Sequence, residues 1–278
     1  MNMNMKKKYL PFLAVLPLFF LAGCDDGDND NDDGRAGKLE ITIEDVQKHR
    51  LTSIIEFMFS GEGIGRQINP ASEAGSGKTW DFSGMDLEKD IMVKIKTSSE
   101  IEKTDYAKSK YVEHFPDAKE CYILTHKAYT WEDVLSSEAI HYDYYDGAKE
   151  FGGAQEYLGE YASANGIGKY TPALEEPYPQ YLGLKFTNKF TVVRTTAYEG
   201  VSIFKEHLDT EIDGEGTVIL PNGDVYNDVL RSKVTIYLQE GGTSVTYMFN
   251  SKKFGNILNL SEAQGLSTAS IQYVNEFK

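Results

Sequence analysis

The sequence predicts an all-β chain with little helix, arranged as an antiparallel β-sandwich or an open β-barrel. Short stretches of alternating apolar and polar residues recur along most of the 278 residues, as in antiparallel strands that bury one face. No window keeps a strong helical period over many turns, and Pro is scarce while Gly, Tyr, Thr, Val and Ile are plentiful. We therefore expect one β-rich domain over residues 38–278.

The chain begins with the features of a signal peptide. Residues 6–8 are three lysines, and residues 9–22 form an apolar stretch that is too short for a comfortable transmembrane helix. The following Leu21-Ala22-Gly23-Cys24 resembles the bacterial lipoprotein box, whose Cys carries diacylglycerol and becomes the new N-terminus. We expect residues 1–23 to be the lipoprotein signal peptide and Cys24 to carry the lipid; the alternative is an ordinary secretory signal with an incidental Cys.

Residues 24–37 combine the lipidated Cys with an acidic tether. The tether holds six Asp and no apolar residue larger than Ala, so it repels itself and cannot bury a core. Another reading is a calcium-binding EF-hand loop from Asn29 to Glu40, but its first position is Asn rather than Asp and no helical pattern precedes it. We favour the extended tether, and the sequence predicts no metal site and no cofactor.

The acidic run after Cys24 also bears on localisation. It resembles the surface-export signal of Bacteroidetes lipoproteins, whereas an Asp directly after the lipidated Cys resembles an inner-membrane retention signal of enterobacteria. The run of six Asp favours the first resemblance. We expect a protein anchored by lipid in the cell outer membrane and exposed at the surface, with a periplasm-facing orientation left open.

Processing changes the charge of the chain. The full sequence has 28 basic and 43 acidic residues and a net charge of −15; loss of residues 1–23 removes three lysines and makes the net charge −18. Six Asp and Arg35 lie in residues 24–37, so the folded body keeps 24 basic and 37 acidic residues and a net charge of −13. A surplus of acid argues against binding of nucleic acid and favours neutral or cationic ligands over anionic ones.

Individual elements follow from local patterns in the first part of the domain. Leu39, Ile41 and Ile43 alternate with charged residues and predict a strand. A helix is expected over residues 44–59, because two acidic residues begin it. Residues 147–180 are rich in Gly, Ala, Tyr and Glu, and they predict an irregular excursion or a long loop with a short helix.

Two hairpins are predicted near the C-terminus. Residues 203–219 and 226–238 flank a Pro-Asn-Gly-Asp turn, and residues 228–239 and 243–250 flank a Glu-Gly-Gly-Thr turn. A second short helix is expected over residues 261–265, which begin with Ser-Glu.

Motifs that would carry catalysis are missing or incomplete. Gly75-Ser76-Gly77-Lys78-Thr79 lacks the earlier Gly of a phosphate-binding loop, and we expect a turn leading into a strand that buries Trp80 and Phe82. The five His form no close metal-binding pair, although His126 and His141 lie on β-like segments and could meet in space. No G-x-S-x-G motif occurs, and the many carboxylates neither name nor exclude a glycosidase pair.

Only Cys121 remains once Cys24 carries lipid, so the mature chain has no intramolecular disulfide. The apolar residues around Cys121 predict a buried, inert thiol rather than a nucleophile.

Two aromatic segments are the candidate ligand-binding regions. Residues 142–146 mix tyrosines with acids, and ring faces can stack on sugars while carboxylates bind their hydroxyls. The competing interpretation is a single strand with Ile140, Tyr142 and Tyr144 on one face. Residues 170–181 form a second aromatic region, read as a loop, and loops carry binding function more often than strands do. The candidate ligand-binding residues are Tyr142, Tyr145, Tyr170, Tyr178 and Tyr181.

Three segments occur in a set order along the chain: GSGKTWDFSG at residues 75–84, DGEGTVILPNG at 213–223 and NDVLR at 227–231. Together they resemble a family of uncharacterised secreted proteins and lipoproteins of the Bacteroidetes, whose corresponding motifs are W-D-F-S-G, D-G-x-G-T and N-V-L-R; Asp228 is an insertion here. Tyr247-Met248-Phe249 takes the place of an aromatic strand near the family's end. The resemblance covers residues 70–260 and implies a cell-envelope β protein, and it transfers no catalytic residue.

The residue types in these segments have structural explanations. Gly214, Gly216 and Gly223 are expected to supply turn conformations that other residues resist. Arg231 follows two apolar residues and is expected to pair with a carboxylate at a strand end.

The sequence favours a non-enzymatic role, binding or envelope scaffolding, with an extracellular glycan or an envelope protein as partner and neither nucleic acid nor nucleotide. Two rivals stay open: a polysaccharide-acting hydrolase with dispersed carboxylates, and a carrier of an apolar ligand. Tyr170, Tyr178 and Tyr181 exposed together would favour glycan binding. Two carboxylates about 5–9 Å apart in a cleft would favour the hydrolase, and a deep apolar cavity would favour the carrier.

Overall fold

The computed structural model describes residues 39–68, 73–158, 165–196, 200–238, 241–263 and 269–277. The predicted signal peptide, Cys24 and the acidic tether lie outside the described residues. The strands are β1 (Glu40–Ile41), β2 (Ile54–Gly61), β3 (Gly75–Asp81), β4 (Val93–Thr104), β5 (Glu120–Thr130), β6 (Leu135–Asp146), β7 (Lys149–Tyr157), β8 (Gly166–Glu175), β9 (Gln180–Tyr181), β10 (Lys185–Thr196), β11 (Gly200–Ile219), β12 (Val225–Tyr237), β13 (Thr243–Ser251), β14 (Gly255–Ala263) and β15 (Ala269–Phe277). The helices are α1 (Ile43–His49) and α2 (Glu62–Gln67), with 3-10 turns η2 (Tyr106–Lys108) and η3 (Val112–His114).

Twelve of the described strands form one closed antiparallel barrel. The order around it is β10-β8-β7-β6-β5-β4-β2-β15-β14-β13-β12-β11, and β11 pairs with β10 along the whole of β10 to close the ring. The prediction of an all-β antiparallel domain is confirmed, and of the two expected architectures the barrel is the one formed. It is closed rather than open, because β11 is a 20-residue strand that pairs with β10 on one side and with β12 on the other.

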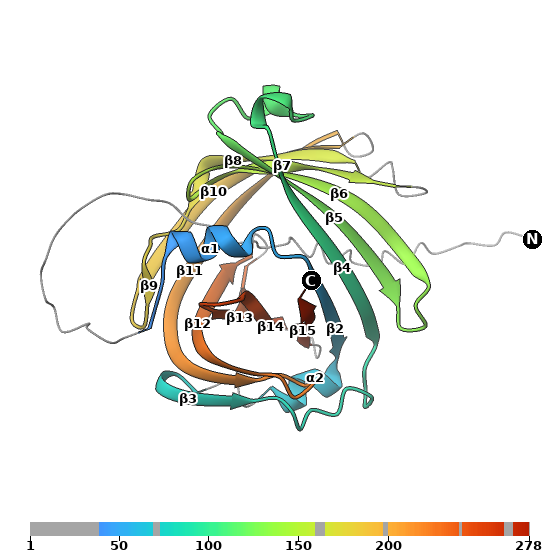
Figure 1. Ribbon diagram of the computed structural model, residues 1–278, viewed down its shortest axis with the longest axis vertical. Coiled ribbons are helices and arrows are strands. Elements are labelled where there is room, and N and C mark those ends of the chain that lie inside the picture. The colour runs from blue at the N-terminus through green and yellow to red at the C-terminus, as the bar shows by residue number, and fades with distance from the viewer. Residues whose placement is uncertain are drawn as a thin grey trace, which may run out of the picture.

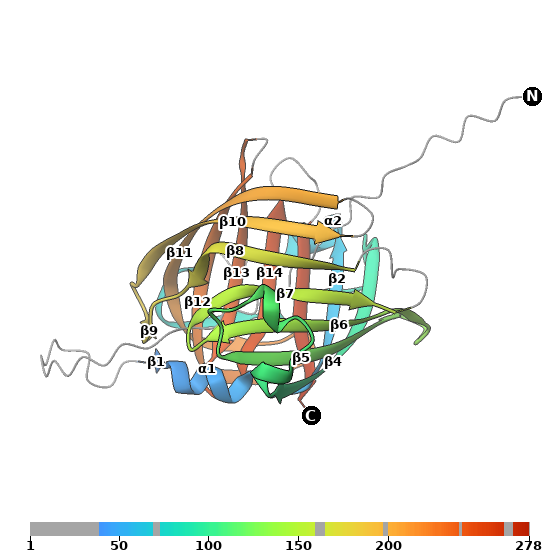
Figure 2. The same ribbon diagram turned by 90° about the horizontal axis from the view of Figure 1, so that it is seen from above.

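The barrel is flattened into two groups of strands that cross each other. Figure 2 shows β4 to β8 and β10 running across the view, in front of β13, β14 and the other strands of the second group, which run roughly upright. Two strands lie outside the antiparallel ring: β3 pairs in parallel with β11, and β1 pairs with β9 in a separate two-stranded sheet. Figure 1 shows β3 beneath β12, outside the ring, and α1 across the near end of the barrel.

Helix α1 is short because its capping signals and its apolar pattern cover only two turns. Thr42 and Asp45 form a capping box, in which the Asp45 N–H donates to Thr42 Oγ1 at 3.3 Å and the Thr42 N–H donates to Asp45 Oδ2 at 3.0 Å. Strand β2 then begins at Ile54, where β-branched and aromatic residues alternate. The expected helix over residues 44–59 is therefore right for its first turns and wrong from Ile54 onward.

Two other expected elements are strands instead. The excursion predicted over residues 147–180 contains β7 and β8, full members of the barrel, because small Gly and Ala residues here allow close strand pairing rather than a loop. The helix predicted over residues 261–265 is wrong for residues 261–263, which end β14. Both predicted C-terminal hairpins are confirmed, as β11–β12 and β12–β13.

A large hydrophobic cluster, here called the outer cluster, packs on the outer face of the second group of strands and is covered by β3 and α2. It is built from Phe59, Ile64, Trp80, Phe82, Val218, Leu220, Val229, Phe249, Ile257, Leu258, Leu260, Ile271 and Tyr273. Trp80 and Phe82 are fully buried, as predicted, and both meet Phe249 edge to face, with ring centroids 5.2 and 5.8 Å apart.

The glycines of the DGEG segment lie inside β11 rather than in a turn. A side chain at Gly214 would collide with the Trp80 ring at 2.7 Å, and one at Gly216 would collide with the backbone of Lys78 at 2.0 Å. These glycines therefore let β3 pack closely on β11, which corrects the expected turn role. Gly223, with φ of 91°, does lie in the β11–β12 turn.

A second outer cluster lies beneath the η2–η3 segment. Tyr142 and Tyr144 of β6 pack there against Phe115 and Cys121. The Tyr144 ring stacks on Phe115 with centroids 4.2 Å apart, and its hydroxyl donates to Ser109 Oγ at 3.1 Å. Cys121 is buried, and burial raises the pKa of its thiol to about 11, as expected for an inert Cys.

Candidate functional site

The inner face of the barrel carries polar side chains together with two hydrophobic clusters, one around Ile212 and Leu230 beneath α1 and one around Leu208, Val234 and Met248. Residues that pair directly across neighbouring strands share a face, and Tyr122 of β5, which approaches Arg50 at the end of α1, identifies the inner one. Following the register from Tyr122 around the ring gives the inner-facing polar side chains: Glu56, Thr97, Ser99, His126, His141, Asp143, Gln155, Arg194, Glu206, Thr210, Ser232, Thr246, Asn259, Ser261 and Gln272.

Water reaches part of this inner face. Glu56, His141 and Asp143 face the interior, yet each keeps an intermediate exposed area rather than being fully buried. The same side chains are surrounded by enough protein to be desolvated, which raises the pKa of Glu56 and of Asp143 to about 7 and lowers that of His141 to about 4. These inner-facing groups are therefore partly exposed and at the same time desolvated.

The charged centre of the interior is a group that we call the Arg50 cluster: Arg50, Glu120, Tyr122, Asp143, Tyr145, Glu150 and Tyr170. It lies where α1 meets the first residues of β5 and β7 and the last residues of β6. Arg50 is the C-terminal cap residue of α1, so the helix that closes the barrel end carries the guanidinium into the cluster.

The guanidinium of Arg50 is held from several sides. Its Nη2 donates to the carbonyl of Gly147 at 3.0 Å, and its Nη1 lies 3.5 Å from Glu120 Oε2. The guanidinium carbon lies 4.2 Å from the ring centroid of Tyr145 and 5.3 Å from that of Tyr122. Nε and Nη1 are buried and have no hydrogen-bond acceptor among the described residues.

The two interior acids of the cluster have strongly shifted pKa values. Burial raises the pKa of Asp143 to about 7, and the charge of Arg50 opposes the shift. Burial, followed by repulsion from Asp143, raises the pKa of Glu150 well above its usual value, against the opposing effects of Arg50 and of a hydrogen bond with Tyr170. At neutral pH, Asp143 is therefore divided between its two forms, and burial favours the protonated form of Glu150. Gly153 makes room for Asp143, because a Cβ there would lie 2.8 Å from Asp143 Oδ1.

Two further buried carboxyls have amide partners. Glu56 accepts from Gln272 Nε2 at 3.0 Å, and Glu176 accepts from Gln180 Nε2 at 2.9 Å. Burial raises the pKa of Glu176 to about 8. Its neighbour Tyr178 donates to it at 3.4 Å.

The two histidines that the sequence placed on β-like segments do meet on the inner face. The rings of His126 and His141 lie 6.3 Å apart at right angles, His126 Nδ1 is 3.1 Å from Ser99 Oγ, and burial lowers the pKa of both. No group of three or more metal-binding side chains occurs within the described ranges. None of the described helices is long and apolar enough to cross a membrane.

The structure separates the five candidate tyrosines. Tyr145 and Tyr170 belong to the Arg50 cluster, and Tyr178 lies beside it, close enough for the Arg50 charge to act on its pKa. Tyr142 faces the opposite side of β6 in the second outer cluster, as the strand interpretation of residues 140–144 requires. Tyr181 pairs with Glu40 in the β1–β9 sheet. Tyr170, Tyr178 and Tyr181 are partly buried and form no shared exposed platform.

Sequence reasoning missed Arg50 and Glu150, the two residues that define the cluster. Arg50 fell within a helix predicted to continue to residue 59, and Glu150 fell in a segment predicted as a loop, so neither had an assigned face. Recognising β7 by its pairing with β6 would have placed Glu150 beside Tyr145.

Comparison with known proteins adds little. No family model matches the chain, and no curated protein matches it. One solved structure, from Bacteroides fragilis, is described as an exported protein with a YmcC-like fold; it has a TM-score of 0.42 and 8% identity, and the match covers 87% of this chain and 99% of that one. At this TM-score the likeness carries no argument about function.

Proposed function

We propose that this chain is a lipid-anchored protein of the cell outer membrane that binds a small polar ligand inside its barrel and catalyses no reaction on it. The observation that supports this proposal is the distribution of side chains. Carboxyls, amides and hydroxyls occupy many inner-facing positions beside two smaller hydrophobic clusters, while the largest hydrophobic cluster packs on the outside. A carrier of apolar ligands needs a continuous apolar lining, because its cavity must replace water around the ligand, and the buried acids of the Arg50 cluster interrupt such a lining.

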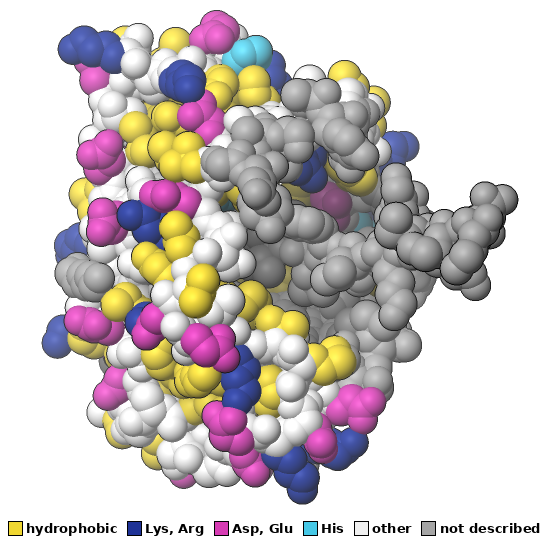
Figure 3. Space-filling model, turned by 90° about the vertical axis from the view of Figure 1, so that its right-hand side faces the viewer, with side chains coloured by type: hydrophobic (Ala, Val, Ile, Leu, Met, Phe, Trp, Pro, Cys, Tyr) yellow, Lys and Arg dark blue, Asp and Glu magenta, His cyan; other side chains and the backbone are white. Residues whose placement is uncertain are grey.

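The charge of the interior favours a neutral or cationic ligand group. Five acids face the interior among the described residues, namely Glu56, Glu120, Asp143, Glu150 and Glu206, and three cations lie on the same side, namely Arg50, Lys103 and Arg194. Lys103 is already paired with Glu120. Figure 3 shows a different pattern on the outer surface that it views, where acidic, basic and hydrophobic side chains are interspersed without a patch of one sign.

Binding is favoured over hydrolysis by the state of the carboxyls. A glycosidase needs one carboxylate that is ionised and one carboxylic acid beside it. In the Arg50 cluster, burial raises the pKa of both Asp143 and Glu150, so burial disfavours the ionised form of each. The extracellular glycan expected from the sequence stays a prediction, and so does a peptide or protein ligand.

Anchoring rests on the sequence of residues 1–37. Mass spectrometry of the mature protein purified from its membrane is expected to show a chain that begins at Cys24 and carries a diacylglycerol thioether. In the Cys24→Ala variant the lipid mass should disappear and the protein should leave the membrane fraction. An unmodified Cys24 would overturn this part of the proposal.

Binding is tested with the mature protein in detergent, titrated by calorimetry against a panel of soluble glycans and short peptides. Asp143→Asn should weaken the interaction at least tenfold, whereas Glu113→Gln, an exposed substitution on the outer η3 turn, should not change it. Recovered ligand should be chemically intact. Conversion of the ligand, or an effect of Glu113→Gln equal to that of Asp143→Asn, would contradict a binding role inside the barrel.

A further inference from the structure

The Arg50 cluster contains donors without an acceptor. Arg50 has five N–H groups, and a buried guanidinium is costly when these stay unfilled. The Gly147 carbonyl takes one at Nη2, while Nε and Nη1 have no hydrogen-bond acceptor among the described residues. Glu120, at 3.5 Å from Nη1, is too far for a hydrogen bond and already accepts from Lys103.

The same cluster contains acids without a cation. Asp143 and Glu150 are close enough to Arg50 for its charge to lower the pKa of both, yet neither forms an ion pair with it. Within the described part of the chain, no other Lys or Arg forms an ion pair with Asp143 or Glu150. Tyr170 lies close enough to Glu150 for the two groups to shift each other's pKa.

We propose that the Arg50 cluster binds the zwitterionic head of a free α-amino acid, with the carboxylate toward Arg50 and the ammonium group toward Asp143 and Glu150. This inference rests on the proposed function and names the ligand class for it. The unfilled guanidinium donors require an acceptor, and an amino acid carboxylate matches their fork geometry. A cation beside Asp143 and Glu150 would favour their ionised forms and pair with them, and the ammonium group is attached one carbon away from that carboxylate.

Other ligand classes satisfy only half of the cluster. A simple amine would pair with the acids but leave Nε and Nη1 of Arg50 unfilled. A dicarboxylate would fill those donors but would bring a second negative charge beside Asp143 and Glu150. A neutral sugar could accept from Arg50 and could not neutralise the acids.

Proton release is the thermodynamic signature of this arrangement. An ammonium group beside Asp143 favours its ionised form, so the pKa of that carboxyl falls when the ligand binds. Because the pKa of Asp143 is about 7 in the free protein, binding should release protons near pH 6–7, and affinity should rise as the pH rises from 5 to 8. The titratable and charged groups that face Asp143 are Arg50 on α1, Tyr122 on β5, His141 and Tyr145 on β6, Glu150 on β7 and Tyr170 on β8.

The experiment uses the mature, full-length protein in detergent and an equimolar mixture of L- and D-amino acids. Equilibrium dialysis with mass spectrometry identifies which of them the protein enriches. Each enriched amino acid is then titrated by calorimetry beside its amide, which lacks the carboxylate, and its N-acetyl derivative, which lacks the ammonium group. We expect each modification to weaken binding at least tenfold, and titration in two buffers of different ionisation enthalpy to show proton release.

Variants locate the site. Arg50→Met and Asp143→Asn should each weaken binding at least tenfold, whereas Arg66→Met, which removes an exposed guanidinium on α2, should leave it unchanged. Asp143→Asn is nearly isosteric, and far-UV circular dichroism checks that both interior variants fold. Enrichment of no amino acid, or equal binding of the amide and N-acetyl derivatives, would overturn the inference. If the glycan and peptide panel still bound inside the barrel, the proposed function would stand without it.

Discussion

Two arginines are both almost fully buried, but they differ in how many of their side-chain nitrogens have a hydrogen-bond acceptor. Arg231, beneath the outer cluster, is 1% exposed and makes a bidentate pair with Asp213, with Nε at 2.8 Å and Nη2 at 2.9 Å from the two carboxylate oxygens. Arg50, at the interior end of α1, is 5% exposed and keeps two nitrogens without acceptors. The first arrangement is complete within the protein, whereas the second leaves polar groups for something that enters the barrel.

The side chains around the two arginines also differ. Around Arg231 the Trp80 indole N–H donates to the Glu73 carbonyl at 2.9 Å, and the rings pack edge to face on Phe249. Around Arg50, by contrast, buried tyrosines and Glu150 lie beside the partly exposed Asp143 and Glu120 on the inner face. We conclude that the outer cluster provides stability, whereas under the proposed function the polar groups of the interior serve a ligand.

The largest effect should follow from emptying the outer cluster. Trp80→Ala removes a fully buried indole that closes the gap between β3 and Gly214 of β11, and it also leaves the Glu73 carbonyl without its donor. We expect the free energy of unfolding to fall by about 4–5 kcal/mol, measured by urea denaturation followed by circular dichroism. Tyr170→Phe, an interior substitution, should cost about 1 kcal/mol or less. A small effect of Trp80→Ala would show that the outer cluster does not hold the fold.

The two arginines themselves give the next largest contrast. Arg231→Met leaves Asp213, which is mostly buried, without its bidentate partner, and we expect a loss of about 3–4 kcal/mol. Arg50→Met leaves Glu120 with Lys103 still beside it and removes donors that were never filled. Its cost should be about 1 kcal/mol, from the lost contacts with Tyr145 and Tyr122 and with the Gly147 carbonyl.

Equal losses in the two variants, from the same urea titrations, would break the comparison. A double variant tests it further. Because the two sites share no partner in the described structure, their losses should add within about 0.5 kcal/mol.

The pH dependence of stability should come from the interior. The pKa of Asp143 is raised to about 7 in the folded protein from an ordinary value near 4, so the folded state binds more protons than the unfolded state between these limits. This contribution is fully present below pH 4 and is lost as the pH rises to 7. Asp143 keeps some contact with water, so we expect a loss of about 2 kcal/mol rather than the full value of the shift.

Asp143→Asn should flatten the fall in unfolding free energy between pH 4 and pH 7. Urea denaturation of the wild type and of this variant at pH 5, 6, 7 and 8 measures the difference. A wild-type stability that rises over this range, with the same rise in Asp143→Asn, would show that the interior acid is not desolvated.

The outer region was more predictable from sequence than the interior. Local patterns predicted the burial of Trp80 and Phe82, the pairing of Arg231 with a carboxylate and the two C-terminal hairpins. They could do so because hydrophobic alternation and turn residues are recognisable within a few sequence positions. The closed ring did not follow from these local patterns. It requires β10 to pair with β11, and it requires β2 to pair with β15, where the contacting Glu56 and Gln272 are 216 residues apart in the sequence.

The interior site was not predictable for a related reason. Glu150 and Arg50 are 100 positions apart in the sequence. Arg50 caps α1, which precedes β2, and Glu150 lies at the start of β7, which is four positions from β2 around the barrel, so no spacing rule joins the two residues. Tyr145 and Tyr170 were predicted as ligand-binding residues for their ring faces. The structure brings both to the Arg50 cluster, and their ligand-binding role stays a prediction. Tyr142 and Tyr181 were named with the same reasoning and lie elsewhere, since composition alone does not assign a face.

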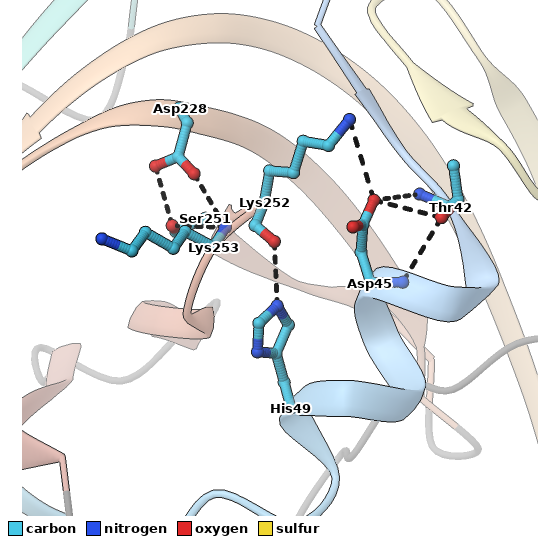
Figure 4. A network of polar contacts seen from close by, with 7 residues as sticks. All are labelled: Thr42, Asp45, His49, Asp228, Ser251, Lys252 and Lys253. Carbon is cyan, nitrogen blue, oxygen red and sulfur yellow. Dashed lines mark hydrogen bonds and ion pairs between the residues drawn. The ribbon is translucent and has the colours of Figure 1, made fainter.

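The smallest expected effect on stability comes from the N-terminal cap of α1, the helix that carries Arg50. Figure 4 shows how this helix is fixed: Thr42 and Asp45 cap it, Lys252 lies 3.8 Å from Asp45, and His49 Nε2 contacts the Lys252 carbonyl at 2.8 Å. Thr42→Ala removes the cap and should cost about 1 kcal/mol of stability. Since α1 carries Arg50, the substitution should also weaken ligand binding severalfold without touching the cluster.

Thr42→Ser keeps the hydroxyl and should preserve both stability and affinity, which separates the cap from any effect of side-chain size. Urea denaturation and the calorimetric titrations described above measure the pair. If Thr42→Ala lowered stability while binding stayed at the wild-type value, Arg50 would be positioned by its own contacts with Gly147, Tyr122 and Tyr145 rather than by the helix. The interior would then be independent of the capping that closes the barrel end, and the two regions would be joined only through the sheet.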